Sequence, residues 1–112
     1  MNVPLLDLKS QYASIKQEIQ MVLEEVCAEQ SFILGAHVLK LEQTLASYIG
    51  TDHAIGVASG SDALLLSLME VGIEPGDRVV TVPFTFFASA GVISRLHARP
   101  VFVDVTPDTF NL

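Results

Sequence analysis

The spacing of the hydrophobic side chains changes at about residue 53, and this change most constrains the fold. Before it, apolar residues recur every three or four positions, which is the period of an amphipathic helix. After it, short apolar runs alternate with helical segments, a pattern typical of parallel strands joined by right-handed helical crossovers. The sequence therefore predicts an α/β fold with two helices followed by βαβαβ.

Two helices are predicted in the first part of the chain. One runs from Ser10 to about Ala28, and the other carries helical spacing from Val38 to Ile49. Gly50 follows the second helix directly and suits a left-handed C-cap. The first helix has an apolar stripe, which needs a surface to lie against. The stripe consists of Tyr12, Ile15, Ile19, Val22 and Val26.

Three buried strands are predicted, at Ala54–Ala58, Arg78–Val82 and Pro100–Val105. Their apolar runs show no alternation, as expected for strands that are covered on both faces. A third helix opens within Ser59–Asp62, and a fourth extends from Phe86 to Leu96. The chain is accordingly divided into a helical segment, residues 1–50, and the start of an α/β domain, residues 51–112.

Composition excludes several classes of protein. The chain has 112 residues, enough for one domain or less. Its 6 basic and 13 acidic residues give a charge of −7, so nucleic acid is not an expected partner. The sequence shows neither an apolar run of membrane-spanning length nor a signal peptide, which favours a cytoplasmic protein without membrane contact. The single cysteine and three scattered histidines predict no disulfide and no metal site.

A turn of small residues, Ser59-Gly60-Ser61-Asp62, is the most informative local feature. The unpaired N–H groups at a helix N-terminus favour an anion, and Gly60 lets the backbone approach a phosphate. Ser61 adds a hydroxyl donor. The alternative is an ordinary helix start, in which Ser61 or Asp62 caps the backbone and Gly60 makes the turn.

An aromatic cluster, Pro83 to Phe87, lies just after the second predicted strand. Open α/β sheets place ligand sites at the carboxyl ends of their strands. One of its three phenylalanine rings, Phe84, Phe86 or Phe87, is suited to stacking on a flat cofactor. The alternative is that all three rings fill the core around the next helix.

These segments together resemble one family. They include Phe32-Ile33-Leu34-Gly35, the stretch from Ala54 to Leu64, Pro75-Gly76-Asp77, Thr85-Phe86 and Pro100 to Asp104. In order and spacing, the chain is similar to the nucleotide-sugar aminotransferases of the DegT/DnrJ/StrS type. The resemblance implies the large domain of the aspartate aminotransferase fold, pyridoxal 5′-phosphate as cofactor and a homodimer. It also implies amino transfer, commonly from glutamate, to a nucleotide-linked keto sugar.

The resemblance also assigns roles to individual residues. Gly60 and Ser61 match the phosphate-binding turn, Phe86 matches the ring that stacks on the pyridine, and Asp62 is expected to act as a cap. Two departures are small: Ala36 stands where proline is common, and the loop before Phe86 is one residue short. The Schiff-base lysine of the family has no match, since the three lysines all lie in the first 50 residues.

We therefore interpret the chain as the N-terminal portion of such an aminotransferase, without a catalytic residue of its own and inactive alone. Two alternatives remain: a small α/β module that binds phosphate or nucleotide without pyridoxal phosphate, and a non-catalytic interaction domain that uses the N-terminal helices. In the family arrangement, the second and third strands are neighbours and Ala54–Ala58 has no partner within this chain. A small complete module would instead pair the first strand with the second.

Overall fold

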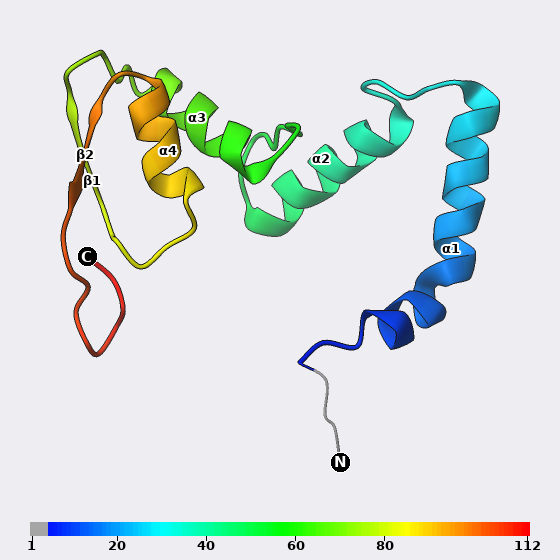
Figure 1. Ribbon diagram of the computed structural model, residues 1–112. Helices are drawn as coiled ribbons and strands as arrows, with labels where there is room; N and C mark the ends of the chain where they lie inside the picture. The colour runs from blue at the N-terminus through cyan, green and yellow to red at the C-terminus, as the bar shows by residue number, and fades with distance from the viewer. Residues whose placement is uncertain (1–4) are drawn as a thin grey trace. The chain divides into compact units, whose positions relative to one another are not determined.

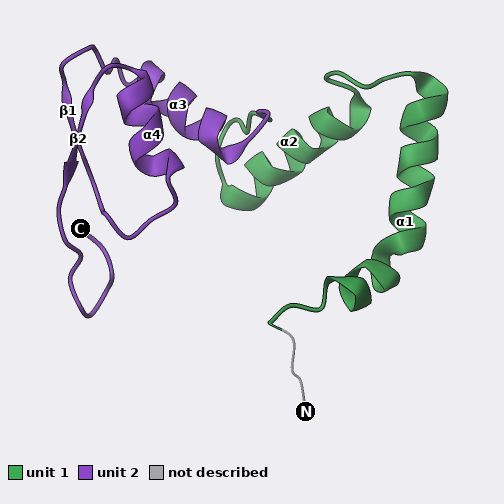
Figure 2. Cartoon of the chain, viewed as in Figure 1, with its two compact units in different colours: residues 1–56 green, residues 57–112 purple. Residues whose placement is uncertain are grey.

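The computed structural model describes residues 5–112 and contains four helices and two strands in that range. The chain divides between Gly56 and Val57 into two compact units (Figures 1 and 2). Unit 1 holds α1, Leu8–Glu29, and α2, Ala36–Ile49. Unit 2 holds α3, β1, α4 and β2, which span Gly60–Glu70, Arg78–Thr81, Ala88–Arg95 and Arg99–Phe102.

The two helices of unit 1 confirm the predicted segments, and capping explains where they begin and end. Asp7 starts α1, because its Oδ1 accepts the N–H of Ser10 at 3.0 Å. Gly50 ends α2 in the left-handed region with φ of 78°, as predicted, and its N–H donates to the Ala46 carbonyl at 2.9 Å. Local sequence signals therefore determine the limits of both helices.

Unit 2 is built around a parallel pair of strands. β1 and β2 pair in register from Arg78 with Arg99 to Thr81 with Phe102, and α4 forms the connection between them. This is the predicted βαβ arrangement, with strands shorter than expected. Between α3 and β1 the chain turns at Gly76, which has φ of 95° and donates its N–H to the His97 carbonyl.

The predicted strand at Ala54–Ala58 is wrong. No strand is assigned there, and the only ladder among residues 5–112 joins β1 to β2. A strand exists through its backbone pairing, and this apolar run finds no ladder partner. The Gly56 N–H instead donates to Oε1 of Glu42, at 2.6 Å. The expectation that only the two later strands pair is confirmed.

The core of unit 2 is small and centres on α4. This helix contacts α3 and both strands, and Ile93 is its most buried residue, at 2% exposure. The other buried residues of the unit are Ala88, Val92 and Ala98. Much apolar surface stays exposed, including Val80 on β1 and Phe102 on β2. None of the helices in residues 5–112 is long and apolar enough to cross a membrane.

Candidate functional site

A largely apolar cavity of about 510 Å³ lies within unit 2. It brings together two elements that the sequence places far apart, the start of α3 and the length of α4. Ser61 lines it from α3, and Phe86 and Phe87 line it from the segment before α4. Two of the three predicted cofactor-binding residues, Ser61 and Phe86, therefore line the same cavity.

The start of α3 is held by a reciprocal pair of hydrogen bonds. The Asp62 N–H donates to the hydroxyl of Ser59 at 3.1 Å, and this hydroxyl donates to Asp62 Oδ2 at 2.9 Å. Ser59 is thus the N-cap, so the reading in which Ser61 or Asp62 occupies this position is wrong. The Asp62 carboxylate accepts no backbone N–H of the first turn and therefore does not itself cap the helix as expected; it bonds the hydroxyl of the N-cap residue Ser59. Ser59 is the N-cap because α3 begins at Gly60, the next residue, so that Ser61 already lies inside the helix.

This cap leaves donors available at the first turn. The N–H groups of Gly60 and Ser61 have no acceptor in a preceding turn, because they stand at the first two positions of the helix. No hydrogen bond from the Ser61 hydroxyl occurs within residues 5–112. Two N–H groups and a hydroxyl at the positive end of a helix dipole form a donor set suited to phosphate.

Gly60 is not required by the chain's own conformation. Its φ lies outside the left-handed region, and a Cβ built on it meets nothing within 4 Å. The interpretation that glycine is needed here to make the turn is therefore wrong. What the missing side chain provides is open space over the backbone N–H groups, which a ligand can approach.

The phenylalanines of the predicted aromatic cluster are exposed. Phe84, Phe86 and Phe87 are 96%, 77% and 81% accessible, so the alternative in which all three fill the core is wrong for this structure. Phe86 and Phe87 line the cavity, whereas Phe84 does not. The ring of Phe87 lies against Gly91, where a Cβ would come within 2.9 Å of its Cε1.

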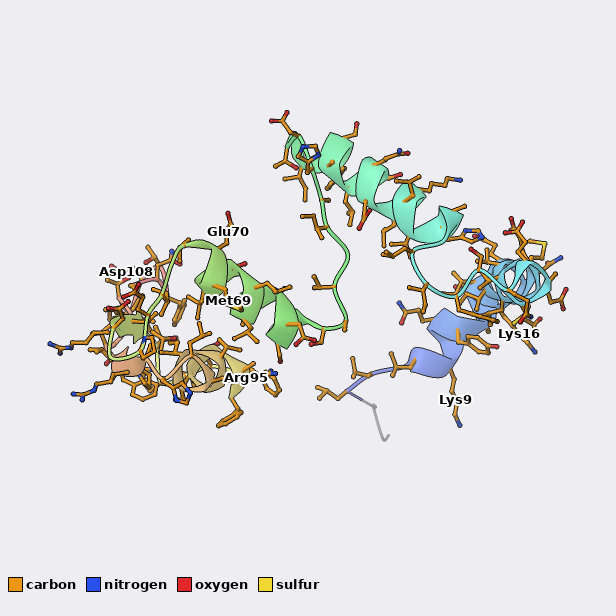
Figure 3. The ribbon with its side chains drawn as sticks, turned by 90° about the horizontal axis from the view of Figure 1, so that it is seen from above. Lys9, Lys16, Met69, Glu70, Arg95 and Asp108 are labelled. Carbon is orange, nitrogen blue, oxygen red and sulfur yellow. The ribbon has the colours of Figure 1, made fainter. Side chains whose placement is uncertain are left out.

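The far part of the cavity was not predicted from the sequence. It is lined by Arg95 at the end of α4 and by Pro100 and Phe102 of β2. Figure 3 shows the Arg95 side chain extending from α4. One signal for this surface existed in the sequence: Gly91 lies within a helix, where glycine is unfavourable and often marks a close approach, here that of the Phe87 ring.

Lysine is missing from the unit that contains the cavity. Lys9, Lys16 and Lys40 all precede residue 57, and the first two extend from α1 in Figure 3. Residues 57–112 therefore contain no amine that can attach a carbonyl compound covalently. The cavity has the donors and rings of a binding site, and no amine lines it.

The sequence profile of the DegT/DnrJ/EryC1/StrS aminotransferase family matches residues 13–112. Among curated relatives, a pleiotropic regulatory protein of Geobacillus stearothermophilus is 53% identical over the whole chain. The UDP-2-acetamido-2-deoxy-3-oxo-D-glucuronate aminotransferase of Pseudomonas aeruginosa is 41% identical over 98% of the chain. The chain spans 30% of the first relative and 31% of the second.

Solved structures agree with this relationship. An aminotransferase of the same family from Brucella abortus superposes with a TM-score of 0.90 and 41% identity, covering 97% of this chain and 29% of its own. DesV of S. venezuelae, in complex with a ketimine intermediate, gives 0.89 and 40%, covering 95% and 29%. Ntda of Bacillus subtilis, with bound cofactor PMP, gives 0.89 and 28%, covering 96% and 25%.

Proposed function

Because the chain belongs to the DegT/DnrJ/EryC1/StrS aminotransferase family, we propose that it is the N-terminal portion of a pyridoxal phosphate-dependent sugar aminotransferase. The observation that carries the proposal is the cavity of unit 2, which joins a phosphate-type donor set at Ser61 to the exposed ring of Phe86. A phosphate and a flat aromatic ring are the two groups that pyridoxal phosphate presents.

The residues present fit this cofactor, which is the cofactor of the family. We assign its phosphate to the N–H groups of Gly60 and Ser61 and to the Ser61 hydroxyl. The open space above Gly60 supports this assignment, since nothing of the chain occupies it. We assign its ring to the face of Phe86, whose exposure leaves that face accessible.

Pyridoxal phosphate, when bound, supplies the electron sink that amino transfer requires. The role of this chain's residues is to hold and orient. Ser59 and Asp62 fix the first turn of α3, so that the donors of Gly60 and Ser61 point in a set direction. Phe86 and Phe87 set the plane of the ring and exclude water from one side of it.

Residues 57–112 contain no lysine for the covalent attachment and proton transfer that amino transfer needs. A lysine is the expected group, because a neutral amine beside a bound ring both attaches carbonyl carbon and moves protons. We propose that this lysine belongs to the part of the protein that corresponds to the other 70% or so of its relatives. The 112-residue chain is then a binding portion and is inactive alone.

The names of the relatives support a substrate class. The Pseudomonas relative acts on a UDP-linked sugar and another, from Streptomyces venezuelae, on a dTDP-linked sugar. We propose a nucleotide-linked keto sugar as amino acceptor and glutamate as amino donor. We also propose that the protein is cytoplasmic and forms a homodimer. The exposed apolar stripe of α1 supports the homodimer, since Tyr12 and Val22 in it are 46% and 40% accessible.

Pyridoxamine phosphate tests the cofactor site without needing a lysine, because its amine forms no covalent bond with protein amines. Titration of the ¹⁵N-labelled chain should shift the amide resonances of Gly60 and Ser61 and those next to Phe86. Nucleotide binding without any response to pyridoxamine phosphate would favour the small phosphate-binding module instead. Partner capture lost on disrupting the α1 stripe, with no ligand bound, would favour the interaction domain.

A further inference from the structure

The segment before α4, residues 83–87, carries the Phe86 ring but contains no helix or strand residue. The ring is exposed, so its own contacts contribute little to fixing it. In addition, α4 begins without a side-chain hydrogen bond at its N-cap, Phe87. The direction of the Phe86 ring therefore depends on how the backbone on either side of it is held.

Both neighbours of Phe86 are held by a residue four positions further along the chain, in α4. The hydroxyls of Thr85 and Ser89 share a hydrogen bond of 2.9 Å, and within the described range 5–112 no other side-chain hydrogen bond involves residues 83–87. The Phe87 ring lies against Gly91, where a Cβ would come within 2.9 Å of its Cε1. The Ser89 N–H also donates to the Phe86 carbonyl, at 3.1 Å. Phe86 is thus held through its backbone and both neighbours, while its ring is left accessible.

A ring that is held before the ligand arrives stacks at a lower entropic cost than a ring that becomes ordered on binding. We propose that Thr85 and Gly91 are positioning residues for the Phe86 ring in cofactor binding. Thr85 acts through its bond to Ser89 and does not line the cavity, whereas Gly91 acts by leaving room for the Phe87 ring. The inference rests on the proposed function, and it gives a role to two residues outside the predicted site.

A role in starting α4 alone makes a different prediction. Thr85→Val keeps the shape of the side chain and removes the hydroxyl, so the helix start should lose stability. Gly91→Ala should instead stabilise the helix, because alanine is favoured over glycine in a helix interior, although its Cβ displaces the Phe87 ring. If these residues affected stability alone, the two variants would not both weaken cofactor binding. Positioning of the ring predicts weaker binding in both.

The test measures the dissociation constants of pyridoxamine phosphate and of inorganic phosphate by NMR titration of the 112-residue chain, together with thermal unfolding. Thr85→Val and Gly91→Ala should each weaken pyridoxamine phosphate binding by about two- to tenfold. Inorganic phosphate has no ring to stack and uses only the donors at Gly60 and Ser61. Its affinity should therefore be the same in the unaltered chain and in both variants.

Two further variants serve as controls. Thr85→Ser retains the hydroxyl and should bind pyridoxamine phosphate as the unaltered chain does. Ser67→Ala removes a hydroxyl that donates to the Ala63 carbonyl at 2.8 Å within α3 and does not line the cavity. It should leave the affinities for both ligands unchanged.

Relaxation of ¹⁵N in the ligand-free chain gives a second readout that needs no cofactor. The Phe86 amide should become more mobile in Thr85→Val and should stay as ordered as in the unaltered chain in Ser67→Ala. Unchanged pyridoxamine phosphate affinity in either Thr85→Val or Gly91→Ala would overturn the inference. Equal weakening of the two ligands, or an equally ordered Phe86 amide in Thr85→Val, would overturn it too.

Failure of the proposed function gives a different pattern. In that case the unaltered chain does not respond to pyridoxamine phosphate at Gly60 and Ser61. The relaxation of the Phe86 amide still decides whether Thr85 holds this residue in place.

Discussion

Replacing Phe86 with leucine distinguishes two possible roles of this ring, stacking on the cofactor and filling the core. Phe86 is 77% exposed, so only about a quarter of its surface is buried. Full burial of such a side chain contributes about 1.5–3 kcal/mol, and leucine restores much of the buried part. The free energy of unfolding should therefore fall by about 0.5 kcal/mol or less. Loss of aromatic stacking costs about 0.5–1.5 kcal/mol, which corresponds to about 2- to 13-fold weaker binding of pyridoxamine phosphate.

The assay compares Phe86→Leu with Phe84→Leu in the same chain. Phe84 is 96% exposed and does not line the cavity, so its replacement should change neither stability nor affinity. Affinity is read from a pyridoxamine phosphate titration, and stability from urea unfolding. A large fall in stability with unchanged affinity in Phe86→Leu would show that this ring is part of the core and would refute the assignment.

Two sets of substitutions and one activity assay test the site and the core further. Gly60→Val should leave the fold intact, since its Cβ meets nothing within 4 Å, but should weaken pyridoxamine phosphate binding more than Ser61→Ala; equal affinities by titration would contradict the phosphate assignment. The chain alone, with added pyridoxal phosphate, should form no 2-oxoglutarate from glutamate and a nucleotide keto sugar, and turnover would show that its catalytic group was overlooked. Ile93→Ala should lower the free energy of unfolding by about 2–5 kcal/mol, because Ile93 is 2% exposed; Val80→Ala, at an exposed position, is the control in urea unfolding.

The helices could be predicted from the sequence because their determinants are local. The three- and four-residue spacing in the first 50 residues predicts α1 and α2, and Gly50 marks the end of α2 by its freedom to adopt positive φ. Asp7 was not singled out as the start of α1, although a carboxylate three residues before the bonded N–H of Ser10 is a common N-cap pattern. Spacing of side chains thus identified the helices, and capping chemistry refines their ends.

Strands depend on a partner, which is why the sequence was less reliable there. The α4 crossover brings two strands, Arg78–Thr81 and Arg99–Phe102, side by side as a parallel pair, as local rules predict. The run Ala54–Ala58 has the same apolar composition and forms no strand, because its backbone pairs with no other strand within residues 5–112. Composition indicates what a strand can bury, and it does not indicate whether a neighbouring strand is present.

At the candidate site, the sequence located the start of the helix but could not decide between two roles for its residues. The sequence placed Gly60 and Ser61 at a helix start, yet a cap and a phosphate site use the same residue types. In the structure Ser59 is the N-cap and bonds to Asp62, so the N–H groups of Gly60 and Ser61 have no acceptor at the first turn. Because Ser59 meets the capping demand, the N–H groups of Gly60 and Ser61 stay unpaired, as they do at the start of any helix, and nothing of the chain fills the space above Gly60, so the site proposed for an anion is open.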